Sequence, residues 1–192
     1  SALLGGAGEP PPPRVTGIYG EFNNENSGNL LASMVNLMAN GKKEDPATKE
    51  VEYEPFELYL TTPGGSLYDM FAIYDMMCHI KDKGCGIETV GVGQVMSAGV
   101  LLLAAGTKGK RKVGRHCRLM MHDVKGEAYG LTRVLQESVD EIQMSKEDLI
   151  QAMMETTKLK EKQLRKIFAQ GTDHFFGAEE AVQYGIADEI IG

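Results

Sequence analysis

The sequence has few of the residues that would supply cross-links or a membrane span. It contains only three cysteines in 192 residues, and these, Cys78, Cys85 and Cys117, form no C-x-x-C pair. An odd number of isolated cysteines argues against a disulfide framework or a zinc site, and favours reduced thiols in a cytoplasmic protein. The longest apolar run, residues 95–105, is too short to cross a bilayer.

Positive charge is also scarce. The chain has 20 Lys and Arg residues against 27 Asp and Glu, which gives a formal net charge of −7. This balance argues against binding to nucleic acid or to an anionic membrane. A basic cluster within residues 108–115 is interpreted as a solvated loop between two apolar segments. The sequence has no G-x-x-x-x-G-K-[ST] phosphate-binding loop, so we expect this chain to bind neither ATP nor any other cofactor or metal.

The order of patterns along the chain predicts one α/β domain. Residues 1–13 end in four prolines and are interpreted as an extended N-terminal arm. From residue 14 to residue 192, short β-rich stretches alternate with helical periodicity. We expect strands at 15–19, 56–61, 87–92 and 118–122, helices at 29–38, 66–78, 97–105, 160–169 and 178–184, and an exposed charged loop at 41–54.

A helix from about residue 129 to residue 154 is the longest element that the sequence predicts. It would extend about 39 Å, which is more than the core of a small domain needs. Its apolar stripe continues along the whole length, so part of that stripe is expected to contact another subunit. The chain is therefore expected to form a homo-oligomer.

Ser97 is the candidate nucleophile. It begins an apolar helix directly after a strand and a predicted turn at Gly93 and Gln94. The N-terminus of a helix supplies free N–H groups and a positive dipole end, which favour a developing oxyanion. Taken alone, a simple N-cap explains this serine better. The surrounding segment also lacks the first glycine of the α/β-hydrolase nucleophile elbow.

His122 is the candidate general base, and the choice of its acid partner is less constrained. It closes an apolar strand and enters a loop, as catalytic groups of α/β domains do, although a purely structural histidine fits equally well. Asp123 should point to the opposite face of the strand. Asp173 lies in a turn and is the better candidate, but the residue pattern leaves Asp140 and Asp188 open as well.

Two adjacent glycines, Gly64 and Gly65, follow the strand at 56–61. Glycine lets the backbone approach a ligand closely, so these residues could present an N–H to an oxyanion or pair with an extended peptide. A plain strand-to-helix turn is the simpler local explanation.

Taken together, these segments resemble the proteolytic subunits of the Clp proteases (ClpP). The resemblance runs from about residue 14 to the C-terminus, with every motif in the family's order. The matching segments are LYLTTPGGS at 58–66, AIYD at 72–75, GQVMSAG at 93–99, LL-AAG at 101–106, KGKR at 108–111, RLMMH at 118–122, AEEA at 178–181 and YGIAD at 184–188.

The resemblance implies a ClpP/crotonase-type fold of repeated ββα units, in which the helix near 129–154 is a protruding handle. It implies a serine endopeptidase with Ser97, His122 and Asp173 as the triad, and the backbone N–H groups of Gly65 and Ala98 as the oxyanion hole. It also implies stacked heptameric rings that enclose unfolded polypeptide. An AAA+ unfoldase would be the partner, and ATP would be used only by that partner.

The sequence departs from the family pattern at four places. Residues 83–86 are a few extra residues before the strand that leads to Ser97. Ala98 replaces a methionine, Thr172 and His174 replace charged neighbours of Asp173, and the proline-rich start does not resemble the family's axial loop. Two alternative functions follow from the same fold. A structural ring subunit would be expected to lack a triad residue, and a crotonase-type acyl-CoA enzyme would rely on carboxylate bases.

Overall fold

A mostly parallel sheet organises the chain in the computed structural model, which describes residues 12–126, 129, 131–169 and 171–192. Within these residues, seven strands form one sheet in which β7 joins both β5 and β8, and only the β7–β8 pair is antiparallel. The α/β class expected from the sequence is confirmed. The main path is β1 (Val15–Tyr19), β4 (Phe56–Thr62), β5 (Ile87–Met96), β6 (Arg111–Gly114) and β9 (Glu189–Ile191), with β7 (Arg118–Met121) and β8 (His174–Phe176) off this path.

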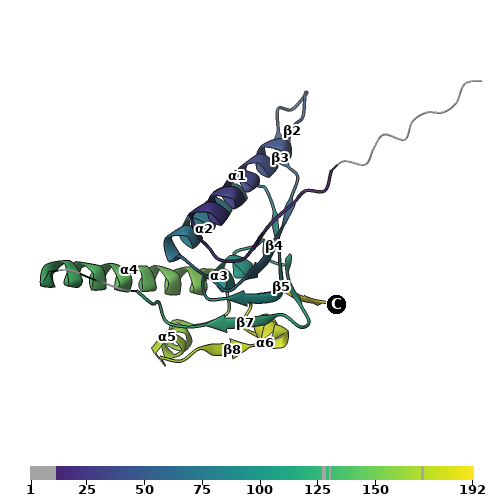
Figure 1. Cartoon of the computed structure of the whole chain (residues 1–192). Coiled ribbons are helices and arrows are strands. Elements are labelled where there is room, and N and C mark those ends of the chain that lie inside the picture. Colours follow the sequence, from purple (N-terminus) through teal and green to yellow (C-terminus); the bar gives the residue numbers. More distant parts are fainter. Residues whose placement is uncertain (1–11, 127–128, 130, 170) are drawn as a thin grey trace, which may run out of the picture.

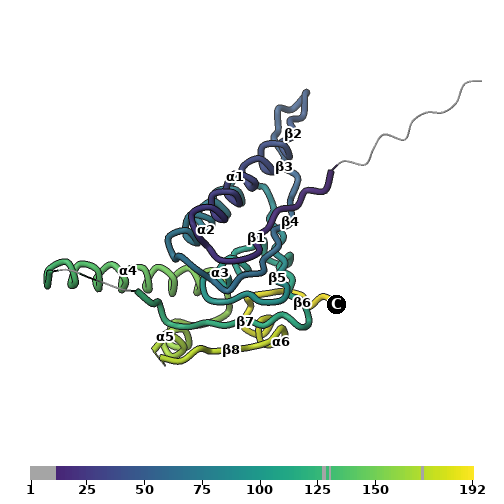
Figure 2. The backbone as a smooth tube through the Cα atoms, viewed as in Figure 1, coloured from purple at the N-terminus to yellow at the C-terminus, as the bar shows by residue number. Residues whose placement is uncertain are grey.

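The helices cover the sheet, except for one that extends away from it. Figures 1 and 2 show α1 and α2 side by side over one part of the sheet, while α4 projects far beyond the body. Among the described residues, no helix has the length and apolarity required to span a membrane. The helices are α1 (Asn24–Asn40), α2 (Leu67–Asp82), α3 (Ala98–Ala104), α4 (Thr132–Thr156), α5 (Glu161–Ala169) and α6 (Ala178–Gln183).

Strand β5 is longer than predicted and determines where the site lies. Residues 89–91 pair with β6, whereas residues 94–96 pair with β7. Between these halves, β5 advances four residues (91 to 95) while β4 advances two (60 to 62), so the predicted turn at Gly93 and Gln94 is a bulge within the strand. Gly93 has φ 70°, which glycine adopts readily. Because β4, β5 and β7 are parallel, their carboxyl ends lie at one edge of the sheet.

The predicted loop at 41–54 instead contains a β-hairpin, formed by β2 (Lys42–Glu44) and β3 (Val51–Tyr53). Its connection is ordered by the side chain of Asp45, whose Oδ1 accepts the N–H groups of Ala47 at 2.7 Å and Thr48 at 2.8 Å. Such a turn closes a hairpin without apolar contacts. The charged segment therefore contains no alternating apolar pattern that would predict the two strands. The hairpin extends beyond the end of α1 (Figure 1).

The basic segment near residue 110 is not simply a solvated loop, because Arg111 lies in β6 and is only 4% exposed. Its guanidinium binds both carboxylate oxygens of Asp188, with Nη2 at 2.6 Å and Nε at 2.8 Å. Nη1 donates to the carbonyl oxygens of Ala104, Thr156 and Gly185. One arginine therefore ties together the C-terminal ends of α3 and α4 and the segment before β9.

Candidate active site

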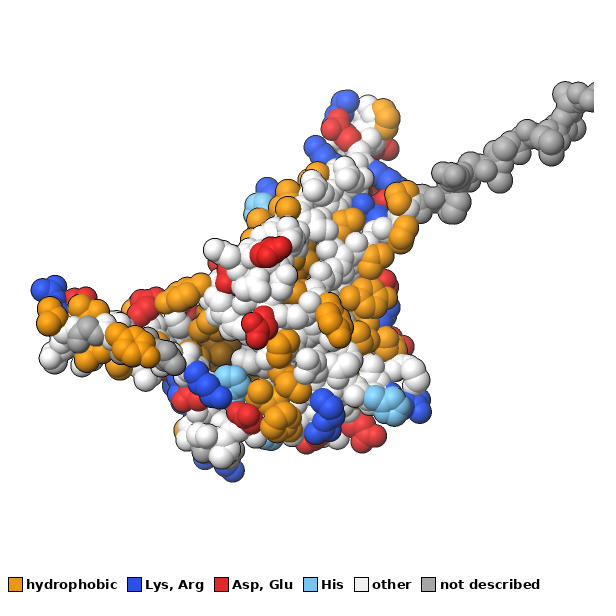
Figure 3. Space-filling model, viewed as in Figure 1, with side chains coloured by type: hydrophobic (Ala, Val, Ile, Leu, Met, Phe, Trp, Pro, Cys, Tyr) orange, Lys and Arg blue, Asp and Glu red, His pale blue; other side chains and the backbone are white. Residues whose placement is uncertain are grey.

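The carboxyl ends of β4, β5 and β7 border a cavity of about 270 Å³. Four residues expected at the active site line it together: Gly65, Ser97, Ala98 and His122. In Figure 3, the surface is hollowed where the projecting helix α4 meets the body. The shared edge of three adjacent strands is the usual location of a site in an open parallel sheet.

Ser97 has a strained backbone and a hydroxyl that caps nothing. Its φ of 53° and ψ of −124° are unusual for a residue with a side chain. It occupies the N-cap position of α3, yet its side chain makes no cap hydrogen bond, while its own N–H donates to the Met120 carbonyl at 2.7 Å. A strained strand-to-helix turn also exposes the nucleophile of α/β-hydrolases. These features favour a nucleophile over the N-cap alternative.

Two backbone N–H groups next to Ser97 are available for an oxyanion. Gly65 forms an isolated parallel bridge with Phe22, in which Phe22 N–H donates to Gly64 O and Ser66 N–H donates to Phe22 O, both at 2.9 Å. The N–H of Gly65 itself takes no part in this bridge. Ala98 is the first residue of α3, where an N–H has no intrahelical acceptor. The sequence patterns contained no signal for the supporting role of Phe22.

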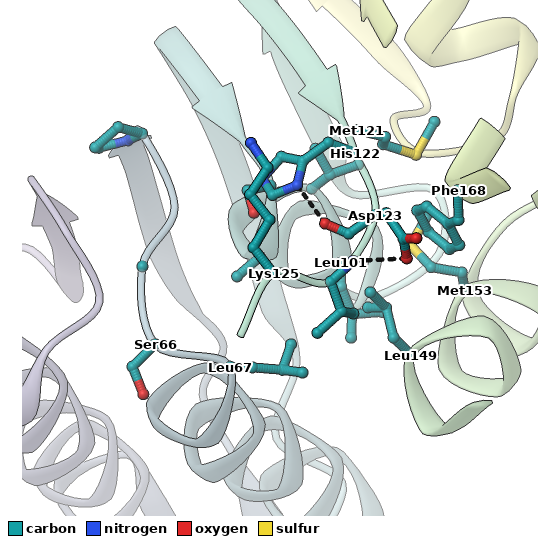
Figure 4. A pocket seen from close by; sticks show the side chains of 16 residues that line it. Ser66, Leu67, Leu101, Met121, His122, Asp123, Lys125, Leu149, Met153 and Phe168 are labelled. Atoms are coloured by element: carbon teal, nitrogen blue, oxygen red, sulfur yellow. Dashed lines mark hydrogen bonds between the residues drawn. The ribbon is translucent and has the colours of Figure 1, made fainter. Parts of the chain in front are cut away.

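The ring of His122 is held by the backbone of the next residue. His122 follows β7 and is half-buried, and its Nδ1 lies 2.5 Å from the carbonyl oxygen of Asp123 (Figure 4). Since a carbonyl can only accept, Nδ1 is the donor in this contact. A neutral ring with its proton on Nδ1 has Nε2 free, as a general base requires.

Asp173 lies beside the cavity rather than in its lining. It precedes β8, and the antiparallel register that pairs Met121 with His174 would place Asp173 opposite His122 one step further along. Its carboxylate is 3.9 Å from Lys125 Nζ and 42% exposed. Among the described residues, no hydrogen bond joins Asp173 to His122. The role of Asp173 therefore stays a prediction, with the strand register in its favour.

The other carboxylates considered for this role are occupied elsewhere. Asp123 directs its side chain away from the His122 ring, to Lys146 and to the N–H of Val124. Asp188 binds Arg111, which lowers the pKa of its carboxyl to about 2. Asp140 accepts a hydrogen bond from Gln136 on the exposed surface of α4.

Apolar side chains form most of the remaining lining, together with Ser66, Asp123 and Lys125. The cavity walls come from helices α2 to α5, which are far apart in the sequence, and Figure 4 shows their side chains beside His122. Nothing in the helical periodicity distinguished these residues from ordinary core positions. The labelled wall residues are Leu67, Leu101, Leu149, Met153 and Phe168.

The comparisons with known proteins agree with this geometry. Residues 14–192 match the family profile described as Clp protease. The chain belongs to the Clp protease family. The resemblance found in the sequence is confirmed, and the α/β architecture is the ClpP fold.

Curated relatives cover most of the chain. It is 35% identical over 179 residues to ATP-dependent Clp protease proteolytic subunit 2 of Chlamydia trachomatis serovar D, which covers 93% of this chain and 80% of the relative. It is 35% identical to subunit 1 of Prochlorococcus marinus subsp. pastoris, over 93% and 83% of the two chains. It is 38% identical to subunit 2 of Parasynechococcus marenigrum, over 91% and 81%.

We expect Gly64→Ala to lower kcat/KM by more than the backbone strain at its positive φ alone would. Gly64 has φ 103°, and a Cβ built there lies 2.6 Å from Cβ of Ser97 and 3.2 Å from its Oγ. Displacement of a reacting group by such a contact should lower kcat/KM by about 100-fold. Gly109→Ala is the matched control, because φ is 84° there and nothing lies within 4 Å of the added Cβ. Equal peptidase activity in the two variants would contradict the account.

Proposed function

We propose that this member of the Clp protease family is a serine endopeptidase subunit, with Ser97 as nucleophile and His122 as general base. The observation that carries the proposal is Ser97 itself. Its backbone is strained, its hydroxyl makes no cap hydrogen bond to α3, and it lines the same cavity as His122. Backbone strain of this kind persists where the surrounding structure enforces it, typically at functional sites.

In the proposed reaction, Ser97 Oγ attacks the scissile carbonyl carbon while its proton passes to Nε2 of His122. The carbonyl electron pair moves onto oxygen, which accepts the N–H groups of Gly65 and Ala98. Collapse of this intermediate breaks the C–N bond, and His122 returns the proton to the leaving amine. Water then hydrolyses the acyl-enzyme by the same steps. Asp173 is proposed to orient His122 and to stabilise the imidazolium by its negative charge.

The apolar walls support a preference for an apolar side chain on the acyl side of the scissile bond. Burial of such a side chain against the leucine, methionine and phenylalanine of the lining is favourable, whereas a carboxylate placed against these side chains would lose its hydration. Ala98 is a small residue next to the nucleophile, so it leaves room for a large substrate side chain.

A panel of fluorogenic peptides tests this function directly. We expect kcat/KM for peptides with leucine or methionine at the cleaved position to exceed that for aspartate by roughly 100-fold. Ala98→Leu should fill part of the cavity and reduce cleavage after leucine more than cleavage after alanine. Ala47→Leu, on the exposed turn of the hairpin, is the control. Equal cleavage of all peptides, or none, would count against the proposal.

Helix α4 supports assembly with further copies of the chain. It projects from the body (Figure 1), and several of its large apolar side chains are exposed. A second copy would cover them, in keeping with a chamber built from stacked heptameric rings. The exposed residues at and before the start of α4 and along it include Leu131, Val134, Val139 and Met144.

The proposed reaction needs no cofactor from this chain, and ATP hydrolysis would fall to an AAA+ unfoldase that delivers unfolded polypeptide. The three cysteines are free, and burial raises the pKa of the Cys117 thiol to about 11, so this thiol stays protonated and unreactive. Free thiols suit the reducing cytoplasm, which is the proposed location.

A further inference from the structure

An exposed ammonium group lies at the rim of the active-site cavity. Lys125 lines this cavity together with Ser97 and His122, and 74% of its side chain is exposed. Figure 4 shows the side chain running beside His122. A second cavity, of about 540 Å³, adjoins the first, and Lys125 lines it as well. Lys125 therefore lies at an open junction that a peptide with its scissile bond at Ser97 has to pass.

The other charge in the lining is already neutralised. Oδ1 of Asp123 lies 2.8 Å from Nζ of Lys146, whose side chain is only 18% exposed. His122 is neutral when it acts as a base. Among the described residues that line the active-site cavity, Lys125 is thus the permanently charged side chain that lacks a close ion pair. The rim of the cavity carries a local positive charge, although the chain as a whole is negative.

The carboxylates near Lys125 compensate this charge only weakly. Asp173 is 3.9 Å from Nζ and is itself 42% exposed. Glu137 and Glu141 line the adjoining cavity, where each is hydrogen-bonded to another side chain. An exposed ion pair contributes little free energy, so a carboxylate of a bound substrate can replace Asp173 as the partner of Lys125. Such an exchange would leave Asp173 available to His122, as the proposed reaction requires.

The position of Lys125 separates two kinds of selection. An apolar side chain of the cleaved residue would be buried against the leucine, methionine and phenylalanine of the cavity walls. The ammonium group at the rim stays hydrated and acts on the residues that flank the cleaved one. It attracts a carboxylate there and repels a second ammonium or a guanidinium group.

We propose that Lys125 is a specificity-determining residue that selects substrates with a carboxylate next to the cleaved residue. The inference rests on the proposed peptidase function and deepens it. The carboxylate can belong to an aspartate or glutamate side chain or to the C-terminus of a peptide, because both groups present the same charge. Lysine or arginine at the same position is disfavoured.

The first measurement is peptide binding, which does not depend on cleavage. Amidated, fluorescently labelled peptides share a leucine at the cleaved position and carry glutamate, glutamine or lysine at one flanking position in turn. In the full-length Ser97→Ala chain, the Kd from fluorescence anisotropy should be roughly tenfold lower for glutamate than for lysine at one of these positions, with glutamine between them. The ratio should fall toward one between about 0.05 M and about 0.5 M salt.

Variants of Lys125 assign this preference to its charge. Lys125→Met should remove the difference between the glutamate and lysine peptides, and Lys125→Glu should reverse it. Lys42→Glu is the matched control, because it changes the net charge equally but lies on the exposed hairpin, away from the cavity (Figure 1). This control should retain the preference. Equal binding of the three peptides by the Ser97→Ala chain, or a preference that survives in Lys125→Met, would overturn the inference.

The second measurement uses cleavage by the chain with Ser97 intact. The same preference should appear in kcat/KM, mainly through KM, because the ion pair forms in the ground state and persists in the transition state. A peptide that ends one residue beyond the cleaved leucine, compared with its amide, tests the C-terminal carboxylate as the second source of charge. A gain for the free carboxylate that disappears in Lys125→Met supports the inference equally. If the wild type binds these peptides with the expected preference but cleaves none of them, the proposed function is wrong and the role of Lys125 in binding stands.

Discussion

Replacement of Ser97 by alanine is expected to reduce peptide cleavage by at least about 10⁴-fold, because it removes the hydroxyl that forms the acyl-enzyme in the proposed reaction. The residual rate would come from substrate binding and the N–H groups of Gly65 and Ala98. The measurement is kcat/KM with a fluorogenic peptide that has leucine at the cleaved position.

The same variant separates a catalytic role from a structural one. The Ser97 hydroxyl makes no cap hydrogen bond, so its loss should leave folding and assembly unchanged. Light scattering should give the same particle size for Ser97→Ala and wild type. Disassembly of the variant would mean that the residue is chiefly structural, and cleavage at the wild-type rate would remove Ser97 from the mechanism.

Arg111→Met is expected to lower the free energy of unfolding by about 3–5 kcal/mol, the usual cost of breaking a buried ion pair. The change leaves Asp188 without its partner and removes the donor to three carbonyl groups. Urea unfolding measures the loss. Lys112→Met is the control, since Lys112 is the next residue of β6 and binds Glu88 near the surface. Equal losses in the two variants would contradict the role given to Arg111.

The pH dependence of unfolding provides a second check on this pair. The hydrogen bond from Arg111 lowers the pKa of Asp188 to about 2, from an ordinary value of 3.8. Because the folded pKa is the lower one, the stabilisation of about 2 kcal/mol is present above pH 4 and is lost as the pH falls toward 2. Wild type and Asp188→Asn should therefore differ most near neutral pH and converge in acid.

The parts of the site that the sequence predicted depend on local signals. A β-rich stretch before an apolar run predicts Ser97 at a helix start, and an apolar run before a loop predicts His122 at a strand end. Both placements agree with the structure. The rejection of Asp123 as a triad acid also rested on local geometry, the alternation of side chains along a strand, and its side chain does point away from the ring.

The features that the sequence concealed depend on contacts between distant residues or on exceptions to local rules. Glycine at position 93 indicated a turn, but pairing with β4 and β7 on either side maintains β5 through a bulge. A basic cluster predicts exposure of Arg111 because charged side chains are usually exposed, and only the fold brings Asp188 to it. No periodicity connects Lys146 to Asp123, because the two residues meet through packing of α4 against the body.

Covalent labelling with a fluorophosphonate probe tests the central claim most directly. Such a probe reacts with an activated serine, so the folded full-length chain should take up one probe per molecule, mapped to Ser97 by mass spectrometry. Ser97→Ala and heat-denatured wild type should take up none. Labelling that is absent from the assembled wild type, or that maps to another serine of the cavity such as Ser66, would contradict the account.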